Sequence, residues 1–173
     1  MTHSEHKKDA VIRLSIGIIT VSTTRTIAED KSGLWMKNRA MELGHDVIVH
    51  EVIPDHRQWI ARTVARCIDE HSPHILLMTG GTGLSPADVT IEAVRPLFSK
   101  ELTAFGSLFA QLSYAEINAA AMLSRATAGI VHTTVVFCLP GSLTACQTAC
   151  DRLIFPEAGH LAAHVRTQPP ATG

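Results

Sequence analysis

The residues best suited to chemistry lie in a glycine-rich segment at positions 79–88, directly after a short apolar run of strand length. Glycine has no Cβ, so Gly80, Gly81 and Gly83 can turn backbone N–H groups toward a ligand. Thr90 is a plausible N-cap for a helix that follows, and a loop that leads into a helix N-terminus favours negative charge. The segment therefore has the features of an anion site.

One carboxylate, Asp88, lies in the same segment. A carboxylate repels phosphate unless a cation lies between them, so the segment predicts a phosphate or nucleotide site with Mg²⁺. A tight strand-to-helix turn without a ligand remains open, because a glycine cluster alone is a weak signal. Two familiar nucleotide motifs are absent: no lysine follows Gly83 as in a P-loop, and the Gly-x-Gly-x-x-Gly spacing does not occur.

Three other connections carry polar groups that suit a ligand. Residues 22–26 combine hydroxyl side chains with Arg25, which suits phosphate or the polar edges of a ring, although an ordinary solvated loop remains open. Asp55 follows the expected end of a strand and precedes a helix, so it is either a ligand-binding carboxylate or an ordinary N-cap. Residues 140–142, Pro-Gly-Ser, follow a further apolar run.

The composition indicates a globular protein. The chain has 173 residues, of which 46% are hydrophobic and 18% charged, with a net charge of −1. This length suits one domain, expected over residues 10–165, with flexible tails at 1–9 and 166–173. The near-neutral charge gives no reason to expect nucleic acid, and no apolar run is long enough for a membrane span. No signal peptide is expected, so the cytoplasm is the expected location.

Cysteine and histidine give weaker signals. The four cysteines are Cys67, Cys138, Cys146 and Cys150. They form no C-x-x-C motif, so buried, reduced thiols are expected rather than a disulfide or a metal site. His160 and His164 have the spacing of a helical metal pair, but without a nearby acidic or cysteine companion a solvated helix face is the favoured interpretation.

The elements that must position these loops alternate between strand and helix. Strands are expected over residues 14–21, 47–53, 74–79 and 133–139. Helices are expected over residues 32–43, 57–70, 91–97, 105–112, 119–125, from about 143 to 154, and 156–165, with Ser32 as a cap and Gly129 as a turn. This alternation predicts an α/β protein with a mostly parallel sheet covered on both faces. Ligands of such sheets lie at the carboxyl ends of the strands, where all four polar connections are expected to meet.

These connections, in this order, resemble the MoaB/Mog family of molybdenum cofactor biosynthesis proteins, and most closely its bacterial MoaB branch. The matching segments are residues 20–22 (Thr-Val-Ser), 53–55 (Ile-Pro-Asp), 79–85 (Thr-Gly-Gly-Thr-Gly-Leu-Ser), 88–90 (Asp-Val-Thr), 105–106 (Phe-Gly), 123–125 (Leu-Ser-Arg) and 139–142 (Leu-Pro-Gly-Ser). The similarity covers about residues 14–154.

The resemblance implies a three-layer α/β/α fold that assembles as a homotrimer or homohexamer and binds molybdopterin and a nucleotide. In active members the terminal phosphate of molybdopterin attacks the α-phosphorus of Mg-ATP, which gives adenylyl-molybdopterin and pyrophosphate. Carried over residue by residue, Asp55 and Asp88 are the acidic pair that holds Mg²⁺ and acts in catalysis. The cofactor-binding residues implied are Ser22, Thr79, Gly80, Gly81, Thr82, Gly83, Ser124, Pro140, Gly141 and Ser142. Arg25 or Arg125 would take the remaining negative charge.

Two positions show how closely the chain follows the family pattern. Ile91 stands where many relatives carry proline, which affects the helix start rather than the chemistry. Some bacterial MoaB proteins have altered the residue that matches Asp55, whereas both carboxylates are intact here, which favours activity. The alternative is a non-catalytic MoaB-type protein that binds molybdopterin or nucleotide as a carrier or assembly partner.

Overall fold

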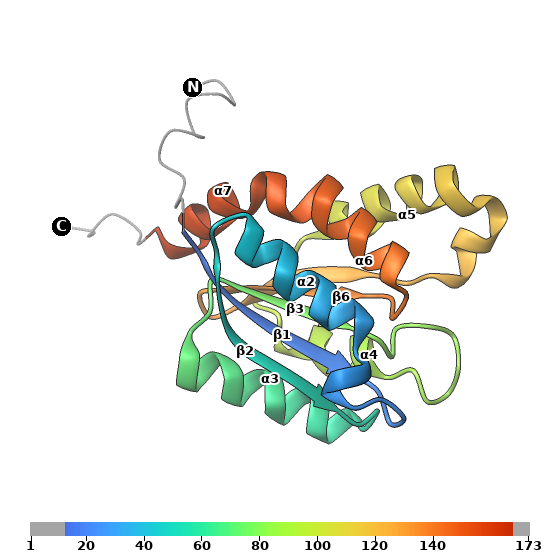
Figure 1. The fold of residues 1–173 in the computed structure, drawn as a ribbon, viewed down its shortest axis with the longest axis horizontal. Helices are drawn as coiled ribbons and strands as arrows, with labels where there is room; N and C mark the ends of the chain where they lie inside the picture. Colours follow the sequence, from blue (N-terminus) through green and yellow to red (C-terminus); the bar gives the residue numbers. More distant parts are fainter. Residues whose placement is uncertain (1–12, 168–173) are drawn as a thin grey trace.

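The computed structural model describes residues 13–167, and a six-stranded sheet forms its centre (Figure 1). The strands are β1 (Ser15–Val21), β2 (Asp46–Ile53), β3 (Ile75–Thr79), β4 (Lys100–Glu101), β5 (Thr127–Val131) and β6 (Thr134–Leu139). They lie in the order β2-β1-β3-β6-β5-β4. The first four strands of this order run parallel, while β5 is antiparallel to both β6 and β4. The sheet is therefore mixed but mostly parallel, as expected.

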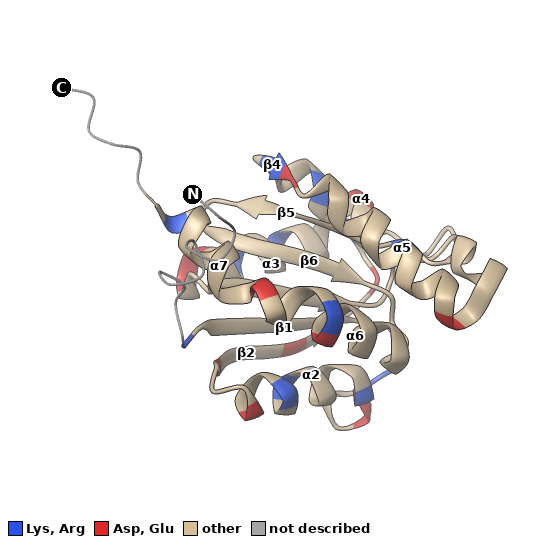
Figure 2. Ribbon diagram, turned by 90° about the horizontal axis from the view of Figure 1, so that it is seen from above, with Lys and Arg blue, Asp and Glu red and all other residues tan. Residues whose placement is uncertain are grey.

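Helices cover both faces of the sheet (Figures 1 and 2). One layer contains α2 (Lys31–Glu42), α5 (Thr103–Ile117), α6 (Leu143–Ala149) and α7 (Phe155–Arg166), and the other contains α3 (Arg57–His71) and α4 (Thr90–Val94). Short turns complete the chain: η2 (Ile27–Glu29), η3 (Arg95–Leu97), η4 (Asn118–Leu123) and the π-helical η5 (Cys150–Ile154), which joins α6 to α7. The expected three-layer α/β/α architecture is confirmed.

Two separate cores hold the layers together because strand side chains alternate between the faces. Ile16 and Ile18 of β1 pack with the layer of α2, α5, α6 and α7, while Ile19 and Val21 pack with α3 and α4. The apolar stripe of α3 is buried in the second core, at Ile60, Val64, Cys67 and Ile68. Hydrophobic burial on both faces of the four parallel strands therefore determines the arrangement of the carboxyl-end loops.

The two strands at the β4 edge were not expected from the sequence. Residue Gly129, predicted as a turn, lies inside β5, and the chain turns instead near His132, whose φ is 53°. A Cβ at position 129 would overlap the ring of Phe98, so glycine is needed there for close packing rather than for a turn. β5 is short and contains Ala and Gly, which have weak strand preference, and its pairing with β6 decides its conformation.

Helix boundaries differ from the predictions at several ends. α5 runs over Thr103–Ile117, beyond the expected end at residue 112, and the helix expected over residues 119–125 is instead the 3-10 turn η4. In α2, Met36 and Ala40 face the core, whereas Leu34 and Leu43 are 37% and 41% exposed. The N-cap of α2 is Asp30 rather than Ser32, because its side chain accepts a hydrogen bond from the N–H of Gly33.

The tails predicted at 1–9 and 166–173 fall mostly outside the described residues. Arg166 is described and closes α7, where its Nη2 donates to the carbonyl of Ser72 at 2.7 Å, so the helix continues beyond residue 165. No helix within residues 13–167 is long and apolar enough to cross a bilayer.

The four cysteines are buried, which confirms the expectation of buried thiols. Burial raises the pKa of Cys67 and of Cys146 to about 11, so both thiols stay protonated at neutral pH. His160 lies beside His164, with ring centroids 4.5 Å apart, and its Nδ1 is 3.3 Å from Glu157 Oε2. No group of three or more metal-ligating side chains occurs in the described part of the chain.

Candidate functional site

A cavity of about 340 Å³ opens at the carboxyl edge of the sheet. It is lined by the connections that follow β1, β2, β3 and β6 and by the end of η4. The predicted residues that line it are Ser22, Asp55, Gly80, Gly81, Thr82, Gly83, Asp88, Ser124, Pro140 and Gly141. The loops meet because the four strands are parallel and in register at their ends, where Val21 pairs with Ile53 and Thr79 with Leu139.

The glycine loop, residues 80–83, has a backbone that only glycine adopts easily at two positions. Gly80 has φ 93° and Gly81 has φ 65°. A Cβ at Gly80 would overlap the carbonyl oxygen of Val21, and one at Gly81 would overlap the hydroxyl of Thr90. The loop therefore lies too close to β1 and α4 for larger residues.

Thr90 fixes the first half of this loop instead of capping α4. Its hydroxyl donates to the carbonyl of Gly80 at 2.8 Å, and its N–H donates to the carbonyl of Gly81 at 2.9 Å. The N-cap of α4 is Val89, so the predicted capping role of Thr90 is wrong. Thr90 thus binds two carbonyls of the glycine loop, a tertiary contact that the local sequence does not predict.

The glycine loop has unused hydrogen-bond donors. Within residues 13–167, the N–H groups of Gly81, Thr82 and Gly83 donate to no protein acceptor. Buried or half-buried N–H groups are almost always paired, so donors left open on a cavity wall are available to a ligand. Several such N–H groups in succession form a concavity that suits an anion.

Two carboxylates flank this loop. Asp55 Oδ1 lies 3.0 Å from the position that a Cβ at Gly81 would occupy, and Asp88 Oδ2 lies 2.7 Å from the corresponding position at Gly83. Asp88 Oδ2 also accepts the N–H of Ser85 at 3.0 Å, whereas Asp55 accepts no hydrogen bond from the described residues. Asp55 does not cap α3, since His56 holds that position. Both carboxylates thus retain lone pairs for a ligand.

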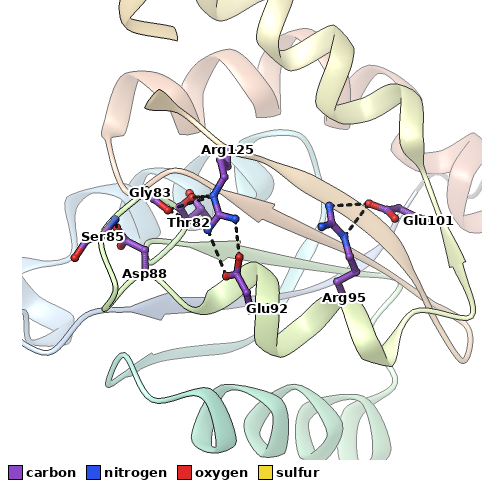
Figure 3. Close-up of polar contacts among 8 residues, drawn as sticks. All are labelled: Thr82, Gly83, Ser85, Asp88, Glu92, Arg95, Glu101 and Arg125. Atoms are coloured by element: carbon purple, nitrogen blue, oxygen red, sulfur yellow. Dashed lines mark hydrogen bonds and ion pairs between the residues drawn. The ribbon is translucent and has the colours of Figure 1, made fainter. Parts of the chain in front are cut away.

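The two arginines considered for the negative charge lie in different settings. Arg25 lines the cavity, together with the hydroxyl groups of its own loop. Arg125 is not among the lining residues: its guanidinium binds the carbonyls of Thr82 and Gly83 and the carboxylate of Glu92, as Figure 3 shows. The hydrogen bond from Arg125 lowers the pKa of the Glu92 carboxyl, which therefore stays ionised. Arg25 is the better placed cation for a bound anion.

Two predicted cofactor-binding residues do not line the cavity. Thr79 is buried, and its hydroxyl donates to the carbonyl of Pro140 at 2.8 Å. Ser142 is the N-cap of α6 and accepts the N–H of Ala145 at 3.2 Å. Both residues shape the turn at 140–142, and their direct contact with a ligand stays a prediction.

Sequence reasoning missed a buried carboxylate next to this site. Asp30 is 0% exposed and accepts hydrogen bonds from the Thr20 hydroxyl at 2.6 Å, the Gly33 N–H at 2.9 Å and His50 Nε2 at 2.9 Å. It starts α2, whose Ser32 hydroxyl donates to the carbonyl of Gly141 at 3.0 Å. The preference of aspartate for the N-cap was the signal that could have identified it.

The fold and the cavity define an α/β protein with a ligand site at the carboxyl edge of its sheet. Residues 17–160 match the family described as a probable molybdopterin binding domain. The chain is 46% identical over 168 residues to molybdenum cofactor biosynthesis protein B of Bacillus subtilis, covering 96% of this chain and 98% of that protein. The chain therefore belongs to the MoaB family of molybdenum cofactor biosynthesis proteins.

Two further relatives agree with this assignment. A protein of Methanocaldococcus jannaschii named as a probable molybdopterin adenylyltransferase is 35% identical over 168 residues, covering 93% of this chain and 98% of that protein. A crystal structure of a molybdenum cofactor biosynthesis protein B is 40% identical and superimposes with a TM-score of 0.87, covering 90% of this chain and 98% of that one.

Proposed function

We propose that this protein adenylylates molybdopterin with Mg-ATP, which yields adenylyl-molybdopterin and pyrophosphate. The observation that carries the proposal is the presence of both Asp55 and Asp88 on one cavity with the glycine loop between them. The name of the M. jannaschii relative supports the same activity. The setting in molybdenum cofactor biosynthesis follows from the family itself.

The reaction needs positioning more than a protein nucleophile. A phosphate oxygen of molybdopterin forms a bond to the α-phosphorus of ATP, and the bond from this phosphorus to the oxygen that bridges to the β-phosphate breaks. Pyrophosphate leaves with that electron pair. The attacking phosphate is already ionised, so no general base is required. The unused N–H groups of Gly81, Thr82 and Gly83 and the guanidinium of Arg25 would bind the phosphate charge.

The donor set fits Mg²⁺ held jointly by protein and nucleotide. Mg²⁺ is typically bound by one or two carboxylates together with substrate phosphates and water, rather than by an all-protein cage. Asp55 and Asp88 would supply the two carboxylates, and the described residues offer no larger cluster. When bound, the ion would neutralise phosphate charge and hold the two substrates together. Ser22, Ser124 and the turn at Pro140 and Gly141 would lie against the pterin.

The test is pyrophosphate release from ATP by the purified full-length protein, measured with and without molybdopterin. Release that requires both molybdopterin and Mg²⁺, and that EDTA abolishes, is the expected result. Binding of molybdopterin and Mg-ATP without release would instead identify the non-catalytic carrier or assembly role.

We also propose a homo-oligomer, a trimer or hexamer, working in the cytoplasm. Apolar side chains on α5 and η4 are unusually open, with Tyr114 61%, Leu123 63% and Met122 80% exposed. Gel filtration with light scattering is the measurement, and a stable monomer at micromolar concentration would contradict the proposal.

A further inference from the structure

The side chain of Arg125 connects two elements that are distant in the sequence. It lies between η4 and β5, and its Nε donates to the carbonyl of Thr82 at 2.9 Å and to that of Gly83 at 3.2 Å, while Nη2 donates to Gly83 at 3.0 Å. On the other side, Nη1 donates to Glu92 Oε1 of α4 at 2.6 Å. Figure 3 shows the guanidinium between the loop and the helix. Arg125 therefore links the second half of the glycine loop to α4.

These contacts determine where the loop N–H groups point. Every peptide bond in residues 13–167 is trans, and in a trans peptide the C=O and the N–H point in opposite directions. The carbonyl of Thr82 shares its peptide with the N–H of Gly83, and the carbonyl of Gly83 shares its peptide with the N–H of Leu84. A guanidinium that holds both carbonyls turns both N–H groups away from itself. Neither N–H has an acceptor within the described part of the chain.

The geometry of arginine is needed for this arrangement. Three nitrogens in one plane bind two carbonyls and a carboxylate at the same time, which the single ammonium of lysine cannot reproduce. Glu92 balances the charge of Arg125, so the pair contributes orientation rather than net positive charge. Thr90 holds the carbonyls of Gly80 and Gly81 in the same way, so α4 restrains both halves of the loop.

We propose that Arg125, held by Glu92, is a positioning residue that orients the N–H groups of Gly83 and Leu84 toward the phosphate chain of the nucleotide. The nature of the ligand rests on the proposed function, whereas the restraint on the loop rests on the hydrogen bonds alone. Arg125 does not touch the substrate in this arrangement. It acts through the loop backbone.

The chain offers a matched control for the test. Arg95 and Glu101 form an ion pair of the same type, with Nη2 and Oε1 3.0 Å apart, and neither residue lines the cavity (Figure 3). The test therefore compares Arg125→Lys and Glu92→Gln with Arg95→Lys in the full-length protein. The measurements are amide hydrogen exchange over residues 80–90, calorimetric affinity for Mg-ATP, affinity for molybdopterin, the KM and kcat of pyrophosphate release, and the thermal midpoint Tm.

With Mg-ATP bound, Arg125→Lys is expected to speed exchange at residues 83 and 84 about tenfold, because only the bound phosphate can protect these N–H groups. The variant is also expected to weaken Mg-ATP binding about 10- to 100-fold, because phosphate binding depends on the direction of the N–H groups. Affinity for molybdopterin should stay within about twofold, and Tm within about 3 °C, since the Arg125 side chain is 33% exposed. Glu92→Gln should show the same pattern at about a third of the size, because the amide keeps one acceptor. Arg95→Lys should match wild type in exchange and in both affinities.

The outcomes separate this inference from the proposed function. If the wild-type protein binds Mg-ATP but releases no pyrophosphate, the proposed adenylylation is wrong. Amide exchange and Mg-ATP affinity in Arg125→Lys would still test the positioning role of Arg125. Arg125→Lys with wild-type exchange and Mg-ATP affinity would overturn the positioning role. Equal losses of Mg-ATP affinity, molybdopterin affinity and Tm would overturn it too, because they indicate general loss of structure. Wild type that fails to bind Mg-ATP would overturn both.

Discussion

The molecule carries two kinds of aspartate at the same edge of the sheet. Asp30 is fully buried, and three groups from β1, β2 and α2 donate hydrogen bonds to it. Asp55 and Asp88 lie half-buried on the cavity wall, where the described residues supply no donor to the first carboxylate and one donor to the second. The hydrogen-bonding capacity of Asp30 is satisfied within the chain, whereas that of Asp55 and Asp88 is not.

We expect this difference to distinguish a structural carboxylate from carboxylates that bind a ligand. A buried carboxylate is tolerated only when its partners replace the lost water, so removing it leaves those partners unsatisfied. A partly open carboxylate with spare lone pairs keeps its solvation until a ligand replaces the water, so removing it changes binding rather than folding. Substitutions in the two regions test this division.

Replacing either cavity carboxylate should abolish most turnover without unfolding the protein. Asp88→Asn and Asp55→Asn are each expected to lower kcat/KM for pyrophosphate release about 100- to 1000-fold, because the charge that would hold Mg²⁺ against phosphate is lost. Tm should change by no more than about 2 °C. The control is Asp69→Asn, an exposed position on α3. Unchanged release by Asp88→Asn would show that its assigned role is wrong.

Removing Asp30 should have the opposite signature. Asp30→Ala is expected to lower the free energy of unfolding by about 3 kcal/mol, because the buried Thr20 hydroxyl and His50 ring lose their acceptor and α2 loses its cap. Asp30→Asn keeps an oxygen for the cap and should lose about half as much. Urea denaturation gives the stabilities, and kcat of the folded protein should stay within about threefold. A loss of kcat comparable with that of Asp88→Asn would contradict the structural role assigned to Asp30.

A smaller effect is expected when the loop backbone itself is strained. Gly81→Ala should lower the free energy of unfolding by about 2 kcal/mol and kcat/KM at least tenfold, since φ is 65° and the new methyl would displace the Thr90 hydroxyl. Gly44→Ala is the matched control: φ is 84°, but nothing lies within 4 Å of the added Cβ. That variant should lose about 1 kcal/mol and keep full activity. Equal activity losses in both variants would argue against a site-specific effect.

The smallest effect is expected at Ser142. Ser142→Ala should lower the free energy of unfolding by about 1 kcal/mol through loss of the α6 cap, with the Kd for molybdopterin unchanged. Urea denaturation and a binding titration measure the two quantities. A tenfold weaker Kd with unchanged stability would instead support the direct contact that the sequence predicted.

The fold was largely predictable where strands are long and apolar. β1, β3 and β6 are buried runs rich in Ile, Val and Leu, and their periodicity and length indicate a parallel sheet. β5 and the two-residue β4 were missed, because Gly129 inside β5 is explained only by its contact with Phe98. Local patterns carry the conformation of a segment, but not a contact with a residue elsewhere in the chain.

The amino-acid order alone was sufficient to predict the glycine loop, both cavity aspartates and the resemblance to the family, because these are features of neighbouring residues. It did not predict that Arg25 lines the cavity whereas Arg125 does not, nor did it predict the buried partners of Asp30. Arg125 binds a carbonyl 43 residues away, and Thr79 binds one 61 residues away. Whether a polar group is already satisfied or still open to a ligand depends on such distant partners, and only the packing of the sheet and its two helix layers brings them together.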